Sequence, residues 1–219
     1  MVWCTSLWAP CEPTGKQAGV REIPENKCRV VKDYDHSKVL FMITVIAGTN
    51  RKGSAAGKLA SRYAALLKEQ TAEEVRLLLL EEEAQDWVHP QMYQEQSESL
   101  RRIQDTYMLP AAKFVFVIPE YNGSYPGYLK LFLDACSVRD IKGTFRGKKA
   151  ALLGVASGRA GNLRGMDHLS GVLHYLGVWV LPSLQPVSRI GDLMDASGSI
   201  THDETIAILT RQAADLAQI

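Results

Sequence analysis

Cysteine, net charge and long apolar runs are all scarce in this sequence, and each shortage excludes a class of protein. Only 4 of the 219 residues are cysteine, and Cys136 alone lies beyond residue 41, so the main body has no disulfide framework and is expected to be cytoplasmic. The formal net charge of +1 gives no electrostatic case for nucleic acid or an anionic membrane as a partner. No apolar run approaches the roughly 20 residues that span a bilayer. The cysteine spacing fits no zinc site, so no bound metal is expected.

Residues 1 to 41 differ from the rest of the chain. They are rich in Trp, Pro and Cys and show no sustained period of 2 or 3.6. The start lacks a basic region followed by a long apolar core, so a signal peptide is not expected. We interpret this stretch as an irregular or flexible extension, with a natural start at Met42 as the alternative. Residues 42 to 219 are then expected to form the functional domain.

From residue 41 onward, short apolar runs alternate with amphipathic segments. The predicted strands are 41–47, 75–80, 114–118, 149–156 and 178–181, and the predicted helices are 54–70, 97–108, 128–139, 163–176 and 203–218. Continuously apolar strands that alternate with helices indicate an α/β fold with a parallel sheet covered on both faces. Right-handed crossovers leave a five-stranded doubly wound sheet as the simplest topology. A closed eight-unit barrel would need roughly 250 residues.

The first of three polar loops, residues 48 to 54, lies between a predicted strand and a predicted helix. A helix N-terminus favours phosphate, because its N–H groups are free and its dipole is positive there. Hydroxyls at Thr49 and Ser54 and the cation of Arg51 add suitable donors. The loop has neither a Walker nor a dinucleotide-binding fingerprint. An ordinary capped loop with a solvated arginine is the alternative interpretation.

The second and third loops, residues 119 to 127 and 157 to 162, follow two further predicted strands. In the second, backbone amides could bond the polar edge of a flat heterocycle while Tyr121 covers its rim; a simple Asn-Gly turn with a solvated acid is the alternative. In the third, two glycines permit close backbone approach to a ligand or a neighbouring subunit, or merely form a flexible connector. Carboxyl ends of parallel strands share one edge of the sheet. Together the loops therefore predict a site for a flat ligand with one phosphate, a mononucleotide.

These loops resemble those of the NADPH-dependent FMN reductase family, flavodoxin-like flavoproteins that include chromate, quinone and azo-dye reductases. The family's first loop, Gly-Ser-x-Arg-x-x-Ser-x-Asn, is similar to Gly48 to Ala56, where Thr replaces Ser and Ala56 replaces Asn. Its second motif, Pro-Glu-Tyr-Asn-x-Ser-x-Pro-Gly-x-Leu-Lys-x-x-x-Asp, matches Pro119 to Asp134 at every fixed position. Its Ser-x-Gly-rich turn resembles Ser157 to Gly165. The resemblance covers residues 42 to 219, and Ala56 removes one expected side-chain contact near the phosphate.

The resemblance implies a flavodoxin-like fold and FMN bound without a covalent bond. The FMN phosphate would lie against Thr49, Arg51, Ser54 and the amides of Ala55 and Ala56, and the isoalloxazine ring against Pro119, Glu120, Tyr121, Asn122 and Gly123, with Ser157, Gly158 and Arg159 nearby. It also implies homodimers or homotetramers that complete the flavin pocket across an interface.

The implied activity is ping-pong hydride transfer from NADPH or NADH to FMN and on to a quinone, azo dye, metal oxyanion or flavin. No residue is assigned as catalytic, because the flavin carries the chemistry, and His168 and His174 are expected to have packed or surface roles. An FMN-binding electron carrier or flavin-dependent regulator without nicotinamide turnover is the alternative, although the chain is not strongly acidic as such carriers tend to be. A mononucleotide-binding module without flavin would require the agreement of three loops to be a coincidence.

Overall fold

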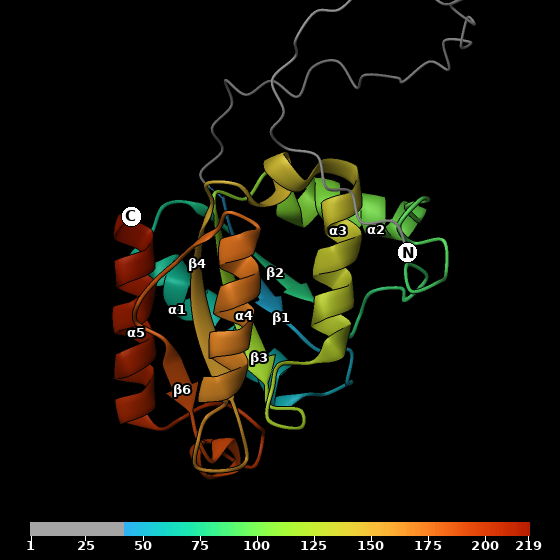
Figure 1. Cartoon of the computed structure of the whole chain (residues 1–219). Coiled ribbons are helices and arrows are strands. Elements are labelled where there is room, and N and C mark those ends of the chain that lie inside the picture. Colours follow the sequence, from blue (N-terminus) through green and yellow to red (C-terminus); the bar gives the residue numbers. More distant parts are fainter. Residues whose placement is uncertain (1–41) are drawn as a thin grey trace, which may run out of the picture. The chain divides into compact units, whose positions relative to one another are not determined.

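The strands of the chain form one parallel sheet, shown in Figure 1 for a computed structural model that describes residues 42 to 219. The interpretation of residues 1 to 41 as an extension falls outside the described residues. The strands are β1 (Met42–Ala47), β2 (Glu74–Leu79), β3 (Lys113–Pro119), β4 (Lys149–Val155), β5 (Trp179–Val180) and β6 (Gln185–Val187). Their order is β2-β1-β3-β4-β5, with β6 also paired to β4, and every pairing is parallel. The predicted doubly wound α/β sheet is confirmed.

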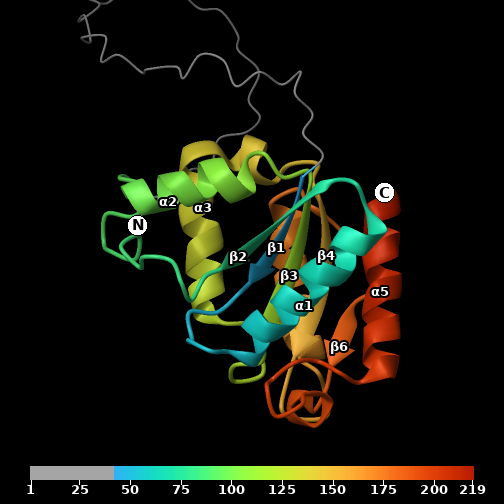
Figure 2. The same cartoon turned by 180° about the vertical axis from the view of Figure 1, so that it is seen from behind.

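Helices cover both faces of this sheet, as the two opposite views in Figures 1 and 2 show. The helical elements are α1 (Ala55–Gln70), α2 (Glu98–Ile103), η1 (Gln104–Met108), α3 (Gly127–Phe145), α4 (Leu163–Tyr175), η2 (Ile190–Leu193) and α5 (Asp203–Gln218). Helices α1 and α5 pack on one face, and α2, α3 and α4 pack on the other. Side chains of a strand point alternately to the two faces. In β3, Phe114 and Phe116 therefore join one core while Val115 and Val117 join the other.

Helix α1 begins where the sequence predicts it. The Oγ of Ser54 accepts a hydrogen bond of 2.9 Å from the N–H of Gly57, which is the expected N-cap geometry. Four large side chains spaced along one helical face are buried, namely Leu59, Tyr63, Leu66 and Leu67. The start of this helix is thereby fixed at the carboxyl edge of the sheet.

The fifth predicted strand, residues 178 to 181, is wrong in extent. Two short pieces occupy this position: β5 pairs with Lys149 and Ala150, and β6 pairs with the far end of β4. The break falls at Pro182, which has no N–H for the ladder. The carbonyl of Leu152 inside the gap instead accepts a 3.3 Å hydrogen bond from Nε2 of Gln212 on α5. A side chain from the last helix thus replaces part of the ladder.

The predicted helix 97–108 is interrupted. Its second half, η1, is a π-helix in which the N–H of Leu109 bonds the carbonyl of Gln104 at 2.8 Å. The extra residue per turn rotates the following side chains. A regular helix over residues 97 to 108 that buries Leu100 and Ile103 would also bury Tyr107, but Tyr107 is only partly buried and Met108 takes the core position. Buried Gln104 is itself bonded through Nε2 to the carbonyl of Cys136 and the hydroxyl of Thr144.

Lys148 immediately precedes β4, at the sheet edge opposite the carboxyl ends of the strands. Its side chain reaches the end of η1. Its Nζ donates hydrogen bonds to the carbonyls of Met108 (2.5 Å) and Leu109 (3.0 Å) and lies 5.3 Å from the centre of the Phe114 ring. Burial lowers the pKa of this amine to about 7. Lys148 therefore closes the end of a helix while remaining easy to deprotonate.

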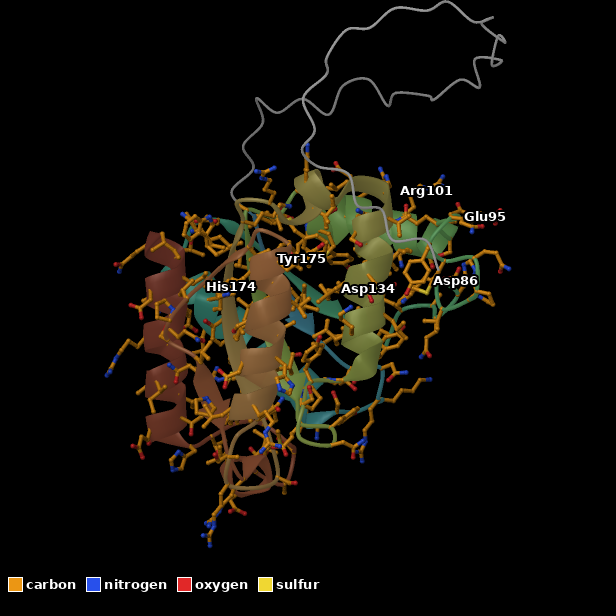
Figure 3. All side chains as sticks on the ribbon, viewed as in Figure 1. Asp86, Glu95, Arg101, Asp134, His174 and Tyr175 are labelled. Atoms are coloured by element: carbon orange, nitrogen blue, oxygen red, sulfur yellow. The ribbon has the colours of Figure 1, made fainter. Side chains whose placement is uncertain are left out.

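Two large aromatic side chains project from the outer side of α4 and β5. Tyr175 is 88% exposed and Trp179 is 72% exposed. Figure 3 shows Tyr175 beside His174 at the last turn of α4. Contiguous exposed apolar patches mark contact surfaces, whereas single exposed aromatic side chains are common. Within residues 42 to 219, the longest apolar helical stretches fall short of what a membrane crossing requires.

Candidate functional site

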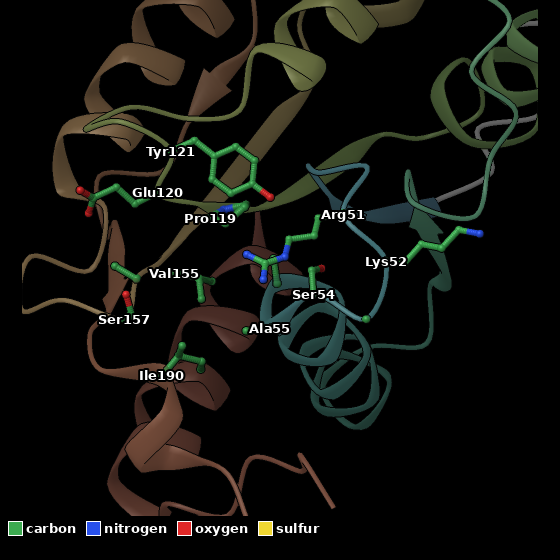
Figure 4. Close-up of a pocket in the computed structure, with 13 residues that line it drawn as sticks. Arg51, Lys52, Ser54, Ala55, Pro119, Glu120, Tyr121, Val155, Ser157 and Ile190 are labelled. Carbon is green, nitrogen blue, oxygen red and sulfur yellow. The ribbon is translucent and has the colours of Figure 1, made fainter.

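A cavity of about 290 Å³ opens at the carboxyl ends of β1, β3 and β4 (Figure 4). All three predicted loops contribute to its wall, as does η2. The residues that line it are Arg51, Lys52, Gly53, Ser54, Ala55, Ala56, Pro119, Glu120, Tyr121, Val155, Ala156, Ser157 and Ile190. The structure therefore brings together Arg51, Ser54, Ala55, Ala56, Pro119, Glu120, Tyr121 and Ser157 of the predicted site residues. It places Thr49, Asn122, Gly123, Gly158 and Arg159 outside this lining.

The amide groups at the start of α1 can be accounted for one by one. The N–H of Gly57 is bonded to Ser54, and those of Gly53 and Ser54 are bonded to the carboxylate of Glu81. Among the described residues, the amides of Ala55 and Ala56 have no hydrogen-bond partner, and both residues line the cavity. Free helix N-terminal amides beside a cavity are suited to an anion.

Arg51 supplies a cation to the same place. Figure 4 shows its guanidinium pointing into the space between Ser54 and Val155, while the side chain of neighbouring Lys52 points away. A guanidinium can donate two parallel hydrogen bonds to phosphate oxygens. Ser54 accepts a bond at its cap position but keeps a hydroxyl proton to donate. This combination fits a phosphate monoester.

Thr49 is fully buried and lies behind the cavity wall. Its Oγ1 is 2.8 Å from the hydroxyl of Tyr121 and accepts a 3.2 Å hydrogen bond from the N–H of Arg51. A contact of this hydroxyl with a phosphate would use its one proton, so Tyr121 would then be the donor in the 2.8 Å bond. In the structure Thr49 instead ties the first loop to the second.

The second loop is a tight hairpin. Tyr121 and Ser124 exchange backbone hydrogen bonds of 2.9 and 3.1 Å, and Asn122 and Gly123 between them have φ of 52° and 75°. This turn geometry explains the Asn-Gly pair. It also leaves the amides of Asn122 and Gly123 without a partner among the described residues. Figure 4 shows the Glu120 carboxylate directed away from Arg51.

Helix α4 supports this hairpin from outside. The Nδ1 of His168 is 2.9 Å from the hydroxyl of Ser124. A Cβ at Gly123 would lie 2.9 Å from Nη1 of Arg164, so the guanidinium covers the turn. His168 and His174 are both exposed, which agrees with the surface roles expected for them.

The third loop is more constrained than a simple connector. The carbonyl of Gly158 accepts a 3.0 Å hydrogen bond from the N–H of Arg189, and that of Arg159 accepts one of 2.6 Å from Ser188. A Cβ at Gly154 would overlap the carbonyl oxygen of Gly161. Of the two loop glycines, Gly161 is closely approached within the chain, since a Cβ there would lie 2.6 Å from Cβ of Pro186, whereas a Cβ at Gly158 would meet nothing within 4 Å. Ser157 faces the cavity from this loop.

Two contributors to the site had no signal in the loop patterns. Ile190 lines the cavity from η2, and Glu81 reaches the first loop from the end of β2. Only the position of Glu81 just after a strand, at the same sheet edge, could have pointed to it. In residues 42 to 219, His, Cys, Asp and Glu form no group of three that could hold a metal ion.

Comparison with known proteins gives a consistent group of relatives. The sequence profile of the family described as NADPH-dependent FMN reductase matches residues 41–191. The chain is 36% identical over 104 residues to an NAD(P)H-dependent FMN reductase of Pseudomonas aeruginosa, covering 47% of this chain and 55% of that protein. It is 33% identical over 93 residues to a 2-hydroxy-1,4-benzoquinone reductase of a Burkholderia species, covering 42% and 50%. The matches thus span about half the length of these curated relatives.

Solved structures agree with the architecture. FerB, a flavoenzyme NAD(P)H:(acceptor) oxidoreductase from Paracoccus denitrificans, superposes with a TM-score of 0.66 at 23% identity, over 81% of this chain and 96% of that one. An azoreductase from Bacillus anthracis gives a TM-score of 0.55 at 17% identity, over 81% and 98%. At these identities the likeness is one of fold, and it confirms the predicted flavodoxin-like sheet.

Proposed function

The chain belongs to the NADPH-dependent FMN reductase family, and on that premise we propose that it is an NAD(P)H-dependent flavin oxidoreductase. When bound, FMN would supply the redox chemistry, accepting a hydride from the nicotinamide nucleotide and passing electrons to a small-molecule acceptor. The observation that carries the proposal is the pair of amides at Ala55 and Ala56, which have no partner within residues 42 to 219 and share a cavity with Arg51 and with the Pro119–Tyr121 wall.

The residues of the first loop would hold the phosphate. Arg51 would donate charged hydrogen bonds, the amides of Ala55 and Ala56 would donate two more, and the Ser54 hydroxyl could donate another. Thr49 would act behind them by holding Tyr121 in place. The missing asparagine side chain at Ala56 leaves the backbone amide at that position available.

The second and third loops would bind the flavin ring. Tyr121 and Pro119 offer apolar surface, and the amides of Asn122 and Gly123, which bond no other described residue, are donors for the polar edge of a heterocycle. Ser157 faces the same cavity, and Gly158 and Arg159 would lie at its rim. Since no acid or base of the protein is needed for hydride transfer, these residues bind and orient without transferring a proton.

The acceptor class is proposed as quinone, azo dye, metal oxyanion or free flavin, with either NADPH or NADH as donor. A benzoquinone reductase among the relatives supports the quinone assignment. We further propose that residues 42 to 219 are the functional domain and that the protein is cytoplasmic; Cys136, the one free cysteine among the described residues, is buried.

We also propose that the protein works as a homodimer or homotetramer. The exposed Tyr175 and Trp179 lie close in sequence at α4 and β5, and a second copy covering them would remove a large apolar area from water. Light scattering coupled to gel filtration measures the assembly directly. Tyr175→Ser should shift it toward monomer if this face is the contact.

Anaerobic mixing with nicotinamide nucleotide tests the activity. The purified protein is saturated with FMN, and the flavin absorbance near 450 nm is followed after NADPH or NADH is added. Bleaching within seconds is expected, with recovery when a quinone is introduced. Flavin that binds but stays oxidised for minutes would instead identify an electron carrier or regulator. A protein that shows no flavin spectral change on mixing with FMN would refute the flavin site altogether.

A further inference from the structure

Glu81 connects the end of β2 to the first loop of the site. Its Oε1 accepts a 3.1 Å hydrogen bond from the N–H of Gly53, and its Oε2 accepts one of 3.3 Å from the N–H of Ser54. A second contact joins the same two segments, since Nδ2 of Asn50 lies 3.4 Å from Oε1 of Gln85. One carboxylate thus binds two successive amides just before α1.

Packing does little to fix this loop. Arg51, Lys52 and Gly53 are exposed, and a Cβ at Gly53 would meet nothing within 4 Å. Gly53 nevertheless has φ of +64°, and Ser54 must be extended to cap the helix. The hydrogen bonds at its two ends, to Thr49 and to Glu81, are therefore what hold the loop in one conformation.

The position of Arg51 relative to the amides of Ala55 and Ala56 depends on that conformation. These two residues belong to helix α1, which is packed on the sheet, whereas Arg51 precedes Gly53 and Ser54, so a rotation at Gly53 or Ser54 would move the guanidinium away from the two N–H groups. Glu81 also occupies the two neighbouring amides, which leaves an anion only the pair that faces Arg51. The carboxylate both shapes the loop and restricts where a phosphate can bind.

We propose that Glu81 is a positioning residue that preorganises the phosphate-binding loop. The proposal rests on the proposed function, because the phosphate is that of FMN. A carboxylate near a phosphate also repels it, but the repulsion is screened by water at this surface. The conformational entropy lost in ordering three exposed residues is a larger free-energy cost than the repulsion between two charges screened by water. The net effect of Glu81 is therefore to strengthen phosphate binding.

The test compares Glu81→Ala with Glu82→Ala. Glu82 is exposed, makes no side-chain hydrogen bond among the described residues, and carries the same charge one position away. Dissociation constants for FMN and riboflavin are measured by flavin fluorescence with the full-length protein. Glu81→Ala should weaken FMN binding about 10- to 50-fold while changing riboflavin binding less than twofold. Glu82→Ala should change neither by more than about twofold.

A conservative variant guards against misfolding. Glu81→Gln keeps one acceptor oxygen for the two amides, so its FMN affinity should lie between those of the wild type and Glu81→Ala. Thermal unfolding without flavin shows whether each variant is folded. If Glu81→Ala does not fold, the same FMN-to-riboflavin comparison is made with Glu81→Gln, where a loss of about 3- to 10-fold is expected.

Several results would overturn the proposal. Unchanged or tighter FMN binding by Glu81→Ala would show that the carboxylate acts chiefly by repulsion. Equal losses for FMN and riboflavin would show that it supports the whole pocket and not the phosphate loop. Failure of the wild-type protein to bind FMN would refute the proposed function, whereas wild-type binding with an unaffected variant would refute only the role of Glu81.

Discussion

Replacing Arg51 by alanine tests the phosphate end of the site most directly. Arg51 is the guanidinium that enters the cavity, and it would make charged hydrogen bonds to the phosphate. Such bonds contribute about 1.5 to 3 kcal/mol. Their loss in Arg51→Ala should make the dissociation constant for FMN about 10- to 140-fold larger. Exposure of the side chain to water favours the lower end. The amides of Ala55 and Ala56 remain, so binding should be weakened and not abolished.

The assay is equilibrium titration of the apoprotein with FMN and with riboflavin at low and high salt. Riboflavin lacks the phosphate, so its affinity should be the same in wild type and Arg51→Ala. Lys52→Ala is the matched control, because it removes the same charge from a side chain that points away from the cavity. Raising the salt concentration should weaken FMN binding more in the wild type than in Arg51→Ala. An unchanged FMN affinity, or equal losses for Arg51→Ala and Lys52→Ala, would refute the assignment.

Three further experiments test the framework of the site and the opposite edge of the sheet. Thr49→Val removes the buried hydroxyl that bonds Tyr121 and should lower the free energy of unfolding, measured in urea, by about 1 to 2 kcal/mol. If the losses from Thr49→Val and Tyr121→Phe simply add in the double variant, the bond between the two hydroxyls contributes nothing to stability. Gly154→Ala forces a Cβ against the Gly161 carbonyl, so the free energy of unfolding should fall by about 1 to 3 kcal/mol. A variant as stable as the wild type would contradict that packing. Burial lowers the pKa of Lys148 to about 7, so between pH 7 and 9 the folded state releases a proton that the unfolded chain keeps. Stability should therefore rise by about 2 kcal/mol over this range, and a Lys148→Met variant with the same pH dependence would refute this.

Local patterns were sufficient for much of the site. Strand ends, a Ser at a helix start and an Asn-Gly pair each follow from the chemistry of a few neighbouring residues, so the position of Ser54 and the turn at Asn122 and Gly123 could be predicted. Parallel topology then placed the loops at one edge. That argument correctly brought Arg51 to the same cavity as Tyr121.

What could not be predicted depends on contacts between distant segments. Glu81 meets its partners across 27 and 28 residues, and Gln212 meets Leu152 across 60. Thr49 carries a hydroxyl suited to phosphate, yet the structure directs it to Tyr121. Gln104 likewise bonds groups on α3 that no helical period reveals. A local pattern identifies the donor or acceptor, and the tertiary structure selects its partner.

The break between β5 and β6 limits how the free edge of the sheet can pair with other chains. A long edge strand exposes a row of unpaired N–H and C=O groups and is a template for aggregation. Here the edge is divided into pieces of 2 and 3 residues, and Pro186 has no N–H to offer. Neither piece is long enough to seed an intermolecular ladder. Folded copies are therefore protected from strand-to-strand association along this side.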